Sequence, residues 1–220
     1  GLNPSARSLL LVMVLAGVFI GASASIQELV KERAIFAREK SVGLSSSAYV
    51  FSKVLFLGVL VIFQTSVFTL ITLFGRPLPE EGVAFGESVL FEIVFGMCVL
   101  ALVSMGIGLF VSAFSNSREQ TMPVLVGVTM IQVVLSGAVP LSIEEILGTV
   151  SNAVPAFWST SMLAATIDLN SISFAQSSDY FDFWESTSSN WYLSAGVLGG
   201  IFLLVIIATI VRVSKVTASR

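Results

Sequence analysis

The densest group of charged side chains lies in residues 28–43, which read Glu-Leu-Val-Lys-Glu-Arg-Ala-Ile-Phe-Ala-Arg-Glu-Lys-Ser-Val-Gly. Long apolar runs precede and follow this segment. At about 1.5 Å per residue, each run can cross most of a hydrocarbon core of about 30 Å. Carboxylate, guanidinium and ammonium groups held between two spans favour polar docking of a partner over a reaction centre. The sequence therefore predicts a helical elbow that a soluble domain can bind.

The rest of the sequence offers no catalytic constellation. It contains no histidine, which excludes histidine-dependent triads, histidine zinc sites and histidine proton relays. It has no Gly-x-x-x-x-Gly-Lys-Ser/Thr loop for ATP, and its acidic residues are scattered rather than placed at metal-ligand spacing. Cys98 is the single cysteine, so no intrachain disulfide can form, and its expected role is packing. We expect no catalytic, cofactor-binding or metal-binding residues in this segment.

Composition identifies the elements that carry the elbow as membrane helices. The chain has 55% hydrophobic residues, 11% charged residues and a mean hydropathy of +0.94, which do not describe a water-soluble domain. Its unbroken apolar runs lack the alternation of a membrane barrel. The predicted fold is an all-α, polytopic membrane helix bundle, a single transmembrane domain over residues 1–220. The five predicted spans are residues 8–24, 48–74, 88–114, 121–139 and 192–211.

Basic residues determine the predicted orientation, because cytoplasmic loops of membrane proteins are enriched in lysine and arginine. When five helices are threaded, the elbow, the turn around Arg118 and the basic C-terminus fall on one side, which is therefore predicted to be cytoplasmic. This threading places residue 1 outside, and the chain starts without an initiating methionine. We therefore expect an earlier helix and six spans in the cytoplasmic membrane. The net charge of -3 averages a basic and an acidic face and does not favour nucleic-acid binding.

Two connections between the spans are too long to be simple turns. Residues 25–47 form the predicted elbow, and residues 140–191 form a predicted external cap with a helix that re-enters the bilayer. Irregular backbone at that depth must be shielded, so the cap should pack over the bundle. The alternative is a loose surface loop in which Trp158, Trp184 and Trp191 anchor the membrane interface.

Polar residues inside predicted spans are functional candidates, because burying them in lipid is costly. Glu92 lies about one turn inside its span, where external water can still solvate it, and a structural role is favoured. Gln64 and Gln132 lie deeper and are expected to point into the bundle or a central cavity, as interhelical contacts or as substrate contacts. Close helix packing, or a dimer interface, is expected at Gly17, Gly21, Gly96, Gly106, Gly108, Gly196, Gly199 and Gly200.

Three segments together resemble the membrane domain of type-2 ABC transporters, with the G subfamily of half-transporters as the closest match. They are residues 32–43 followed by Tyr49, Ser52 and Lys53, residues 106–120 (GIGLFVSAFSNSREQ), and residues 135–140 (LSGAVP). The resemblance covers nearly the whole chain in the right order. It implies that the elbow joins the second and third of six helices, that a re-entrant cap separates the fifth and sixth, and that the first helix and an ATPase domain lie upstream.

The resemblance also implies roles for individual residues. Contact with the nucleotide-binding domain is expected for Glu28, Glu32, Arg33, Arg38, Glu39 and Gly43. The family lines a central two-fold cavity with its second and fifth helices, which implicates Phe19, Thr129, Gln132 and Val133, and Gln64 is a further polar candidate. Relatives carry a bulky apolar plug above the cavity, whereas this chain has the smaller segment Gly137-Ala138-Val139. A cap without cysteines favours a bacterial exporter, and actinobacterial exporters that fuse phosphopeptide-reading domains to an ATPase are the specific expectation.

The implied function is the permease of an ATP-driven exporter that moves an amphipathic or lipid-like substrate by alternating access. Its expected partners are membrane lipid, an ABC ATPase domain and a second copy of the chain in a homodimer. ATP and Mg would bind in the associated ATPase domain. A non-transporting scaffold whose elbow docks a signalling protein is the alternative. An ion-coupled carrier would need ionisable groups at mid-membrane depth, and the chain offers only Glu92 near the edge.

Overall fold

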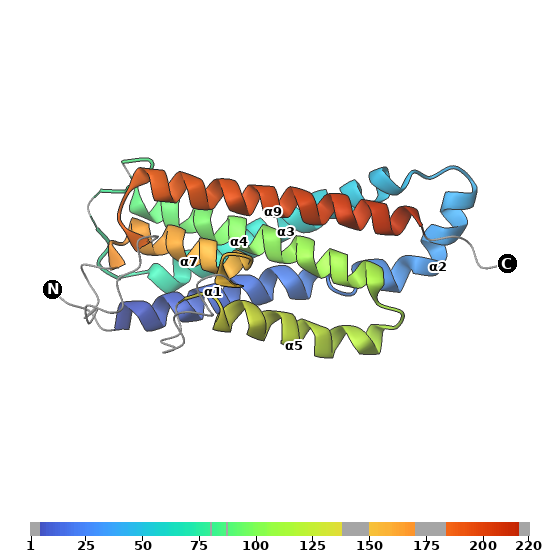
Figure 1. Ribbon diagram of the computed structural model, residues 1–220, viewed down its shortest axis with the longest axis horizontal. Coiled ribbons are helices and arrows are strands. Elements are labelled where there is room, and N and C mark those ends of the chain that lie inside the picture. The colour runs from blue at the N-terminus through green and yellow to red at the C-terminus, as the bar shows by residue number, and fades with distance from the viewer. Residues whose placement is uncertain (1–4, 80, 87, 138–149, 170–183, 216–220) are drawn as a thin grey trace.

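The computed structural model describes residues 5–79, 81–86, 88–137, 150–169 and 184–215. Over these residues the chain is an elongated helical bundle, which confirms the predicted all-α fold (Figure 1). The bundle contains the long helices α1 (Ser5–Ser25), α3 (Ser46–Leu73), α4 (Val89–Phe114) and α9 (Ser188–Ser214), with α5 (Arg118–Val134) beside α1. The short helix α2 (Glu28–Ser41) lies at one end, and α7 (Pro155–Thr166) lies in the opposite half.

Four stretches of the described chain are long and apolar enough to cross a membrane. They are the Ala6–Ser41 stretch that contains α1, and the helices α3, α4 and α9. The fifth predicted span, residues 121–139, is helical over the 17 residues of α5, and residues 138–139 lie outside the described part of the chain. A helix of that length rises about 25 Å, which is at the short end for a crossing. Its status as a complete span stays a prediction.

Helix α4 is the centre of the bundle. It packs against α1, α3, α7 and α9, and its buried residues are distributed around the helix rather than along one stripe. A helix that is apolar all round is stable where neighbouring helices cover it. Serine caps mark where two helices begin. Ser45 Oγ accepts a hydrogen bond from the Ala48 amide at the start of α3, and Ser88 Oγ accepts one from the Phe91 amide at the start of α4.

Small residues allow α1 and α4 to pack backbone against backbone. A Cβ atom on Gly21 would lie 2.0 Å from the Ala101 carbonyl oxygen. Ser25 Oγ uses this close approach to donate a hydrogen bond of 2.8 Å to the Met105 carbonyl. Close neighbours likewise confirm the packing predicted for Gly17, Gly96, Gly106 and Gly108.

The glycines of α9 behave differently. A Cβ atom added to Gly196, Gly199 or Gly200 would have no neighbour within 4 Å. The prediction that these three glycines pack within the bundle is therefore wrong, because no other described element approaches this face of α9. A dimer interface at this face stays a prediction.

The described part of the predicted cap packs inside the bundle. All 12 residues of α7 are buried, and α7 packs against α4 and α9. Trp158, Trp184 and Trp191 are 8%, 2% and 2% exposed. The alternative of a loose loop with three interfacial tryptophans is therefore wrong for these residues. The rest of the cap, residues 140–149 and 170–183, and the plug residues Ala138 and Val139 lie outside the described part of the chain.

Glu92 does not face water, contrary to expectation. Its side chain is fully buried. Its carboxylate accepts hydrogen bonds from the amides of Val83 (3.1 Å), Ala84 (2.7 Å) and Phe85 (2.8 Å) and from the Thr166 hydroxyl (3.1 Å). These four donors replace water around the charge. The carboxylate therefore joins the loop before α4 to the end of α7.

Candidate functional site

The elbow forms where α1 turns into α2. Helix α1 ends at Ser25, and α2 begins at Glu28 with no side-chain cap from the preceding Gln27. The hydroxyl of Ser112, on α4, instead accepts hydrogen bonds from the amides of Leu29 and Val30, both at 3.0 Å. These amides belong to the first turn of α2, where backbone donors lack helical partners. The central helix thus caps the elbow helix from outside.

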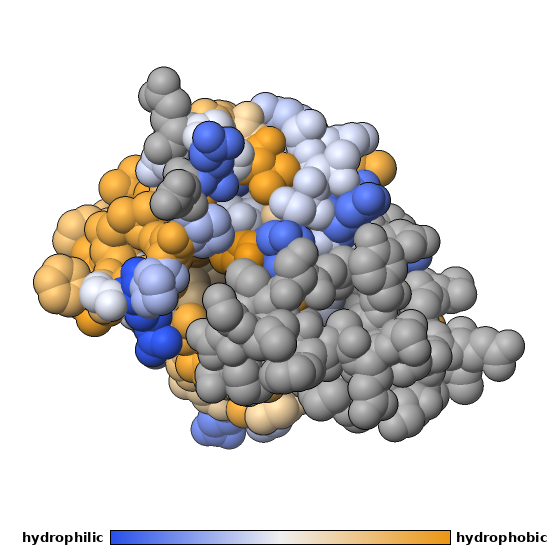
Figure 2. All heavy atoms as spheres, turned by 90° about the vertical axis from the view of Figure 1, so that its left-hand side faces the viewer, coloured by the Kyte–Doolittle hydropathy of each residue, from blue (hydrophilic) through white to orange (hydrophobic). Residues whose placement is uncertain are grey.

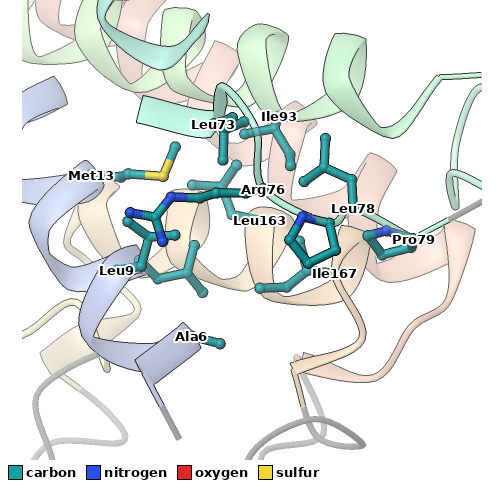
Figure 3. A pocket seen from close by; sticks show the side chains of 12 residues that line it. Ala6, Leu9, Met13, Leu73, Arg76, Leu78, Pro79, Ile93, Leu163 and Ile167 are labelled. Atoms are coloured by element: carbon teal, nitrogen blue, oxygen red, sulfur yellow. The ribbon is translucent and has the colours of Figure 1, made fainter. Parts of the chain in front are cut away.

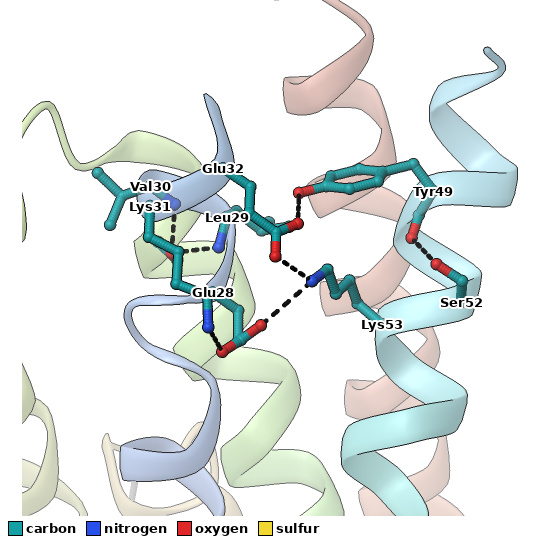
Figure 4. Close-up of polar contacts among 9 residues, drawn as sticks. Glu28, Leu29, Val30, Lys31, Glu32, Tyr49, Ser52 and Lys53 are labelled. Atoms are coloured by element: carbon teal, nitrogen blue, oxygen red, sulfur yellow. Dashed lines mark hydrogen bonds and ion pairs between the residues drawn. The ribbon is translucent and has the colours of Figure 1, made fainter. Parts of the chain in front are cut away.

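Four side chains fix α2 to the start of α3 (Figure 4). Lys53 Nζ lies 2.7 Å from Glu32 Oε1 and 3.2 Å from Glu28 Oε2. The Tyr49 hydroxyl donates a hydrogen bond of 3.0 Å to Glu32 Oε2. Burial acts to raise the pKa of Glu32, but the hydrogen bonds from Lys53 and Tyr49 outweigh burial and hold that pKa below its usual range. The Glu32 carboxylate is therefore charged at neutral pH and attracts Lys53.

Two basic residues of α2 contact the ends of two other helices. Arg33 Nη1 donates to the Ser115 carbonyl and to Asn116 Oδ1, both at 3.3 Å, where α4 ends. Lys40 Nζ donates to the Ser214 carbonyl, where α9 ends. Cations suit these positions, because the last carbonyls of a helix lack helical partners and carry partial negative charge. Helix α2 is thus bound to the ends of α3, α4 and α9 that lie at the elbow.

Apolar packing lies beneath these polar contacts. Leu29 and Phe36 are the buried residues of α2, and they join a core cluster that includes Val50 of α3 and Val213 of α9. The ring of Phe36 stacks on the ring of Tyr49, with centroids 4.5 Å apart. The buried side chains of Leu29 and Phe36 anchor α2 to the bundle. A displacement of α2 would therefore act on three spanning helices together.

The residues predicted to contact an ATPase domain all lie in this elbow, in two groups. Glu28, Glu32 and Arg33 are partly buried and make the contacts within the chain described above. Arg38, Glu39 and Gly43 are exposed. Gly43 has a φ of 112°, which lets the backbone turn from α2 toward α3. The contact of all six residues with an ATPase domain stays a prediction.

The predicted cavity residues do not share one surface of the chain. Phe19 on α1 is 50% exposed, and Gln64 on α3 is also exposed, so Gln64 does not point into the bundle. Thr129 and Gln132 of α5 are each 3% exposed, and Val133 is partly buried. The role of these five residues in a cavity stays a prediction.

The buried face of α5 points toward α1. Leu125 packs in a cluster with Ala22 and Ile26 of α1, and Thr129 and Gln132 follow Leu125 at helical spacing on the same face. The hydroxyl of Thr129 and both amide atoms of Gln132 have no hydrogen-bond partner among the described residues. Buried polar groups are normally hydrogen-bonded, because leaving them unpaired is costly. This face therefore offers hydrogen bonds to a polar group that enters between α1 and α5.

The described residues offer no site for a metal ion. They contain no group of three or more His, Cys, Asp or Glu side chains that could hold one. Cys98 is buried in α4, with its Sγ 3.4 Å from Ser66 Oγ, so its predicted packing role is confirmed.

Sequence reasoning missed Ser112 and the contacts that Tyr49 and Lys53 make. Tyr49, Lys53 and Ser112 belong to the segments that carry the family resemblance, but the sequence assigns none of them a contact in the elbow. A serine near the elbow end of a span was an available signal, because serine hydroxyls bond to neighbouring helices. The partners of Ser112, however, depend on the packing of α2 on α4. Leu29 and Val30 lie about 80 positions before Ser112 in the sequence.

Residues 3–167 match the sequence model of a family described as ABC-2 type transporter. The chain is also 34% identical over 191 residues to a protein of Mycobacterium tuberculosis named ABC transporter ATP-binding/permease protein Rv1747. This similarity covers 86% of the chain and 22% of that protein. The chain therefore spans less than a quarter of the length of this relative, whose name joins an ATP-binding part and a permease part.

Proposed function

Because the chain belongs to the ABC-2 type transporter family, as a multi-pass permease domain of the cell membrane, we propose that it serves an ATP-driven exporter. The proposed cargo is amphipathic or lipid-like and crosses the membrane by alternating access. The observation that carries this proposal is the elbow: α2 contacts the ends of α3, α4 and α9 and still exposes Arg38 and Glu39.

The proposed driver is an ABC ATPase domain that binds ATP and Mg and docks on the exposed face of α2. The name of the Mycobacterium tuberculosis relative, with ATP-binding and permease parts in one protein, supports this partner. Glu28, Glu32 and Arg33 would transmit the movement of α2 to the bundle, whereas Arg38, Glu39 and Gly43 would contact the ATPase domain. Nucleotide must bind the two states of the transporter with different affinity, since otherwise hydrolysis shifts no equilibrium.

The proposed transport pathway lies between α1 and α5 of two copies of the chain. Support comes from the exposed apolar side chains of these helices, including Phe19, Met130 and Ile131, and from the unpaired polar atoms of Thr129 and Gln132. The exposed faces would supply apolar contacts, and the buried face of α5 toward α1 would supply hydrogen bonds once the helices separate, which together suit a cargo that has both apolar and polar parts. Gln64 and Val133 are kept as candidate contacts of the same cargo.

ATP hydrolysis by the assembled transporter in lipid vesicles tests the elbow. Arg38→Ala removes a proposed contact with the ATPase domain, and Glu32→Ala removes the contact with Lys53 inside the elbow. Glu185→Ala is the matched control, because Glu185 is exposed at the opposite end of the bundle. We expect hydrolysis stimulated by lipid or substrate to be lost in both elbow variants and retained in the control.

The outcome separates the exporter from the scaffold. Both elbow variants must first be shown to fold and to assemble with the ATPase domain, by size-exclusion chromatography of the complex. If ATP hydrolysis in the assembled elbow variants is still stimulated by lipid or substrate, the elbow does not couple to the ATPase domain, and the scaffold alternative is favoured. Loss in Arg38→Ala alone would restrict the coupling role to the exposed face of α2.

A further inference from the structure

An apolar cavity opens at the end of the bundle opposite α2 (Figure 3). Its volume is about 140 Å³, and its lining includes Leu9 and Met13 of α1, Ile93 of α4, and Leu163 and Ile167 at the end of α7. An apolar cavity of about 150 Å³ in another protein binds benzene. A cavity of this size therefore holds a segment of one hydrocarbon chain rather than a whole drug-sized ligand.

Arg76 is the one basic side chain among the described residues that line this cavity. The side chain of Arg76 follows the end of α3 and extends across the cavity toward Leu9 and Met13 (Figure 3). Its Nε donates a hydrogen bond of 2.9 Å to the Thr72 carbonyl in the last turn of α3, which orients the guanidinium group. Arg76 has no ion pair with any described carboxylate, and its side chain is exposed. Its terminal nitrogens are therefore available to an anion from outside the chain.

The surroundings distinguish Arg76 from the other arginine at this end. Arg7 donates to the Gly137 carbonyl at 3.2 Å, and its guanidinium lies over the ring of Trp184, so Arg7 serves the bundle itself. Pro77 and Pro79, which follow Arg76, also line the cavity and restrict the backbone there. Seen from this end, hydrophilic and hydrophobic side chains adjoin on the surface that is drawn in colour (Figure 2). An amphiphile at such a boundary can keep its head group in water and its chain in the protein.

We propose that this cavity binds an anionic phospholipid of the leaflet opposite the elbow, with its phosphate on Arg76 and part of one acyl chain between α1, α4 and α7. The guanidinium fork matches phosphate oxygens bidentately. A free anion does not fit as the occupant, because the described lining has no other basic side chain than Arg76 to bind it. No residue of α5 is among the described residues that line the cavity, so the lipid site does not depend on the proposed pathway.

Native mass spectrometry of the full-length protein in detergent, titrated with dioleoylphosphatidylglycerol or dioleoylphosphatidylcholine, tests the proposal. Wild type should bind phosphatidylglycerol at least about tenfold more tightly than phosphatidylcholine, and Arg76→Gln should lose this preference, since one charge-assisted contact corresponds to about a tenfold change. Arg76→Lys should retain part of the preference. Ile167→Trp should fill the cavity and weaken the binding of both lipids. Arg118→Gln, at the elbow end, is the matched control and should bind like wild type.

Each contrary result overturns a stated part of the proposal. Equal affinity of wild type for the two lipids would overturn the preference for an anionic lipid, and an unchanged preference in Arg76→Gln would overturn the role of Arg76. Unchanged binding in Ile167→Trp would overturn the acyl-chain site. Displacement of phosphatidylglycerol by excess inorganic phosphate would assign Arg76 to a free anion and overturn the lipid. Thermal unfolding of every variant in detergent establishes that it is folded before its binding is interpreted.

Discussion

Carboxylates stabilise both ends of this bundle, but in opposite surroundings. Glu92 is fully buried and accepts four hydrogen bonds from the protein. Glu28 and Glu32 of the elbow keep 17% and 30% of their side chains exposed and share Lys53. Breaking the contacts of a buried charge costs about 3–5 kcal/mol, whereas a partly exposed ion pair contributes about 0–1 kcal/mol. The contacts of Glu92 are therefore costly to break, and the ionic contacts of the elbow can be exchanged at much lower cost.

This difference agrees with the proposed function. A coupling element must change its contacts when nucleotide binds, so its ionic contacts should be few and easily exchanged. The opposite end must keep its loop and α7 closed onto α4 while the elbow moves. The α1–α4 interface, where Gly21 brings the two backbones together, provides a rigid connection between these ends.

Replacing Glu92 should have the largest effect. Glu92→Ala leaves the amides of Val83, Ala84 and Phe85 without their acceptor, at an expected cost of about 3–5 kcal/mol. For a domain of this size, that corresponds to a fall of about 10 °C in the melting temperature. Thermal unfolding in detergent, followed by the fluorescence of the buried tryptophans, measures the change.

Glu81→Ala is the matched control for Glu92, because Glu81 belongs to the same loop and is exposed. Its melting temperature should stay within about 2 °C of wild type, since exposed substitutions change stability by about 0.5 kcal/mol. Equal shifts in the two variants would show that burial of the Glu92 carboxylate does not stabilise this end.

Removing the cap of the elbow should have an intermediate and local effect. Ser112→Ala leaves the amides of Leu29 and Val30 without the hydroxyl that accepts from them, at an expected cost of about 1 kcal/mol. Amide hydrogen exchange of residues 26–43 should become roughly fivefold faster, while exchange at α7 stays unchanged.

Ser41→Ala is the control for the cap, because Ser41 lies on the same helix and, among the described residues, its hydroxyl bonds to the nearby Arg38 carbonyl. It should leave exchange across the first turn of α2 unchanged. Uniform acceleration across the bundle in Ser112→Ala would show instead that Ser112 supports the whole fold, and the difference between the two ends would then be smaller than we infer.

Much of the fold was predictable from the sequence, because apolar runs and serine or glycine boundaries are local signals. The four long spans and the elbow between the first two follow from hydropathy and charge alone. Which individual glycines pack against another helix does not follow from these signals. Gly21 and Gly196 look alike in the sequence, yet a Cβ atom on Gly21 would meet the Ala101 carbonyl and one on Gly196 would meet open space. Which helix faces meet is decided by packing between distant segments.

The candidate site was predictable only in part, for the same reason. The density of charged residues located the elbow. The sequence does not show which of these residues bond within the chain. Lys53 and Tyr49 contact Glu32 only because the fold brings α3 beside α2, whereas Arg38 stays exposed. The position of Glu92, about one turn inside a helix, predicts contact with water. In the structure the preceding loop folds over Glu92, and three backbone amides of that loop donate hydrogen bonds to its carboxylate in place of water. A loop that supplies only backbone groups leaves no signal in side-chain chemistry.

Acid should weaken the elbow slightly, which is the smallest expected effect. The pKa of Glu32 is lowered, because hydrogen bonds from Lys53 and Tyr49 outweigh the burial that would raise it. A lowered pKa in the folded state stabilises the fold above the usual glutamate pKa of about 4.3, and this stabilisation is lost as the pH falls through the folded value. The melting temperature of wild type should therefore exceed that of Glu32→Gln by about 1–3 °C at neutral pH, and the two should converge in acid.

Glu119→Gln separates this effect from the general loss of carboxylate charge, because Glu119 is exposed in the first turn of α5. Its difference from wild type should stay small at every pH. If the difference between wild type and Glu32→Gln does not shrink in acid, the charge of Glu32 does not stabilise the elbow, and its packing against Tyr49 must do so. The two ends of the bundle would then differ in burial alone and not in how they use a charged carboxylate.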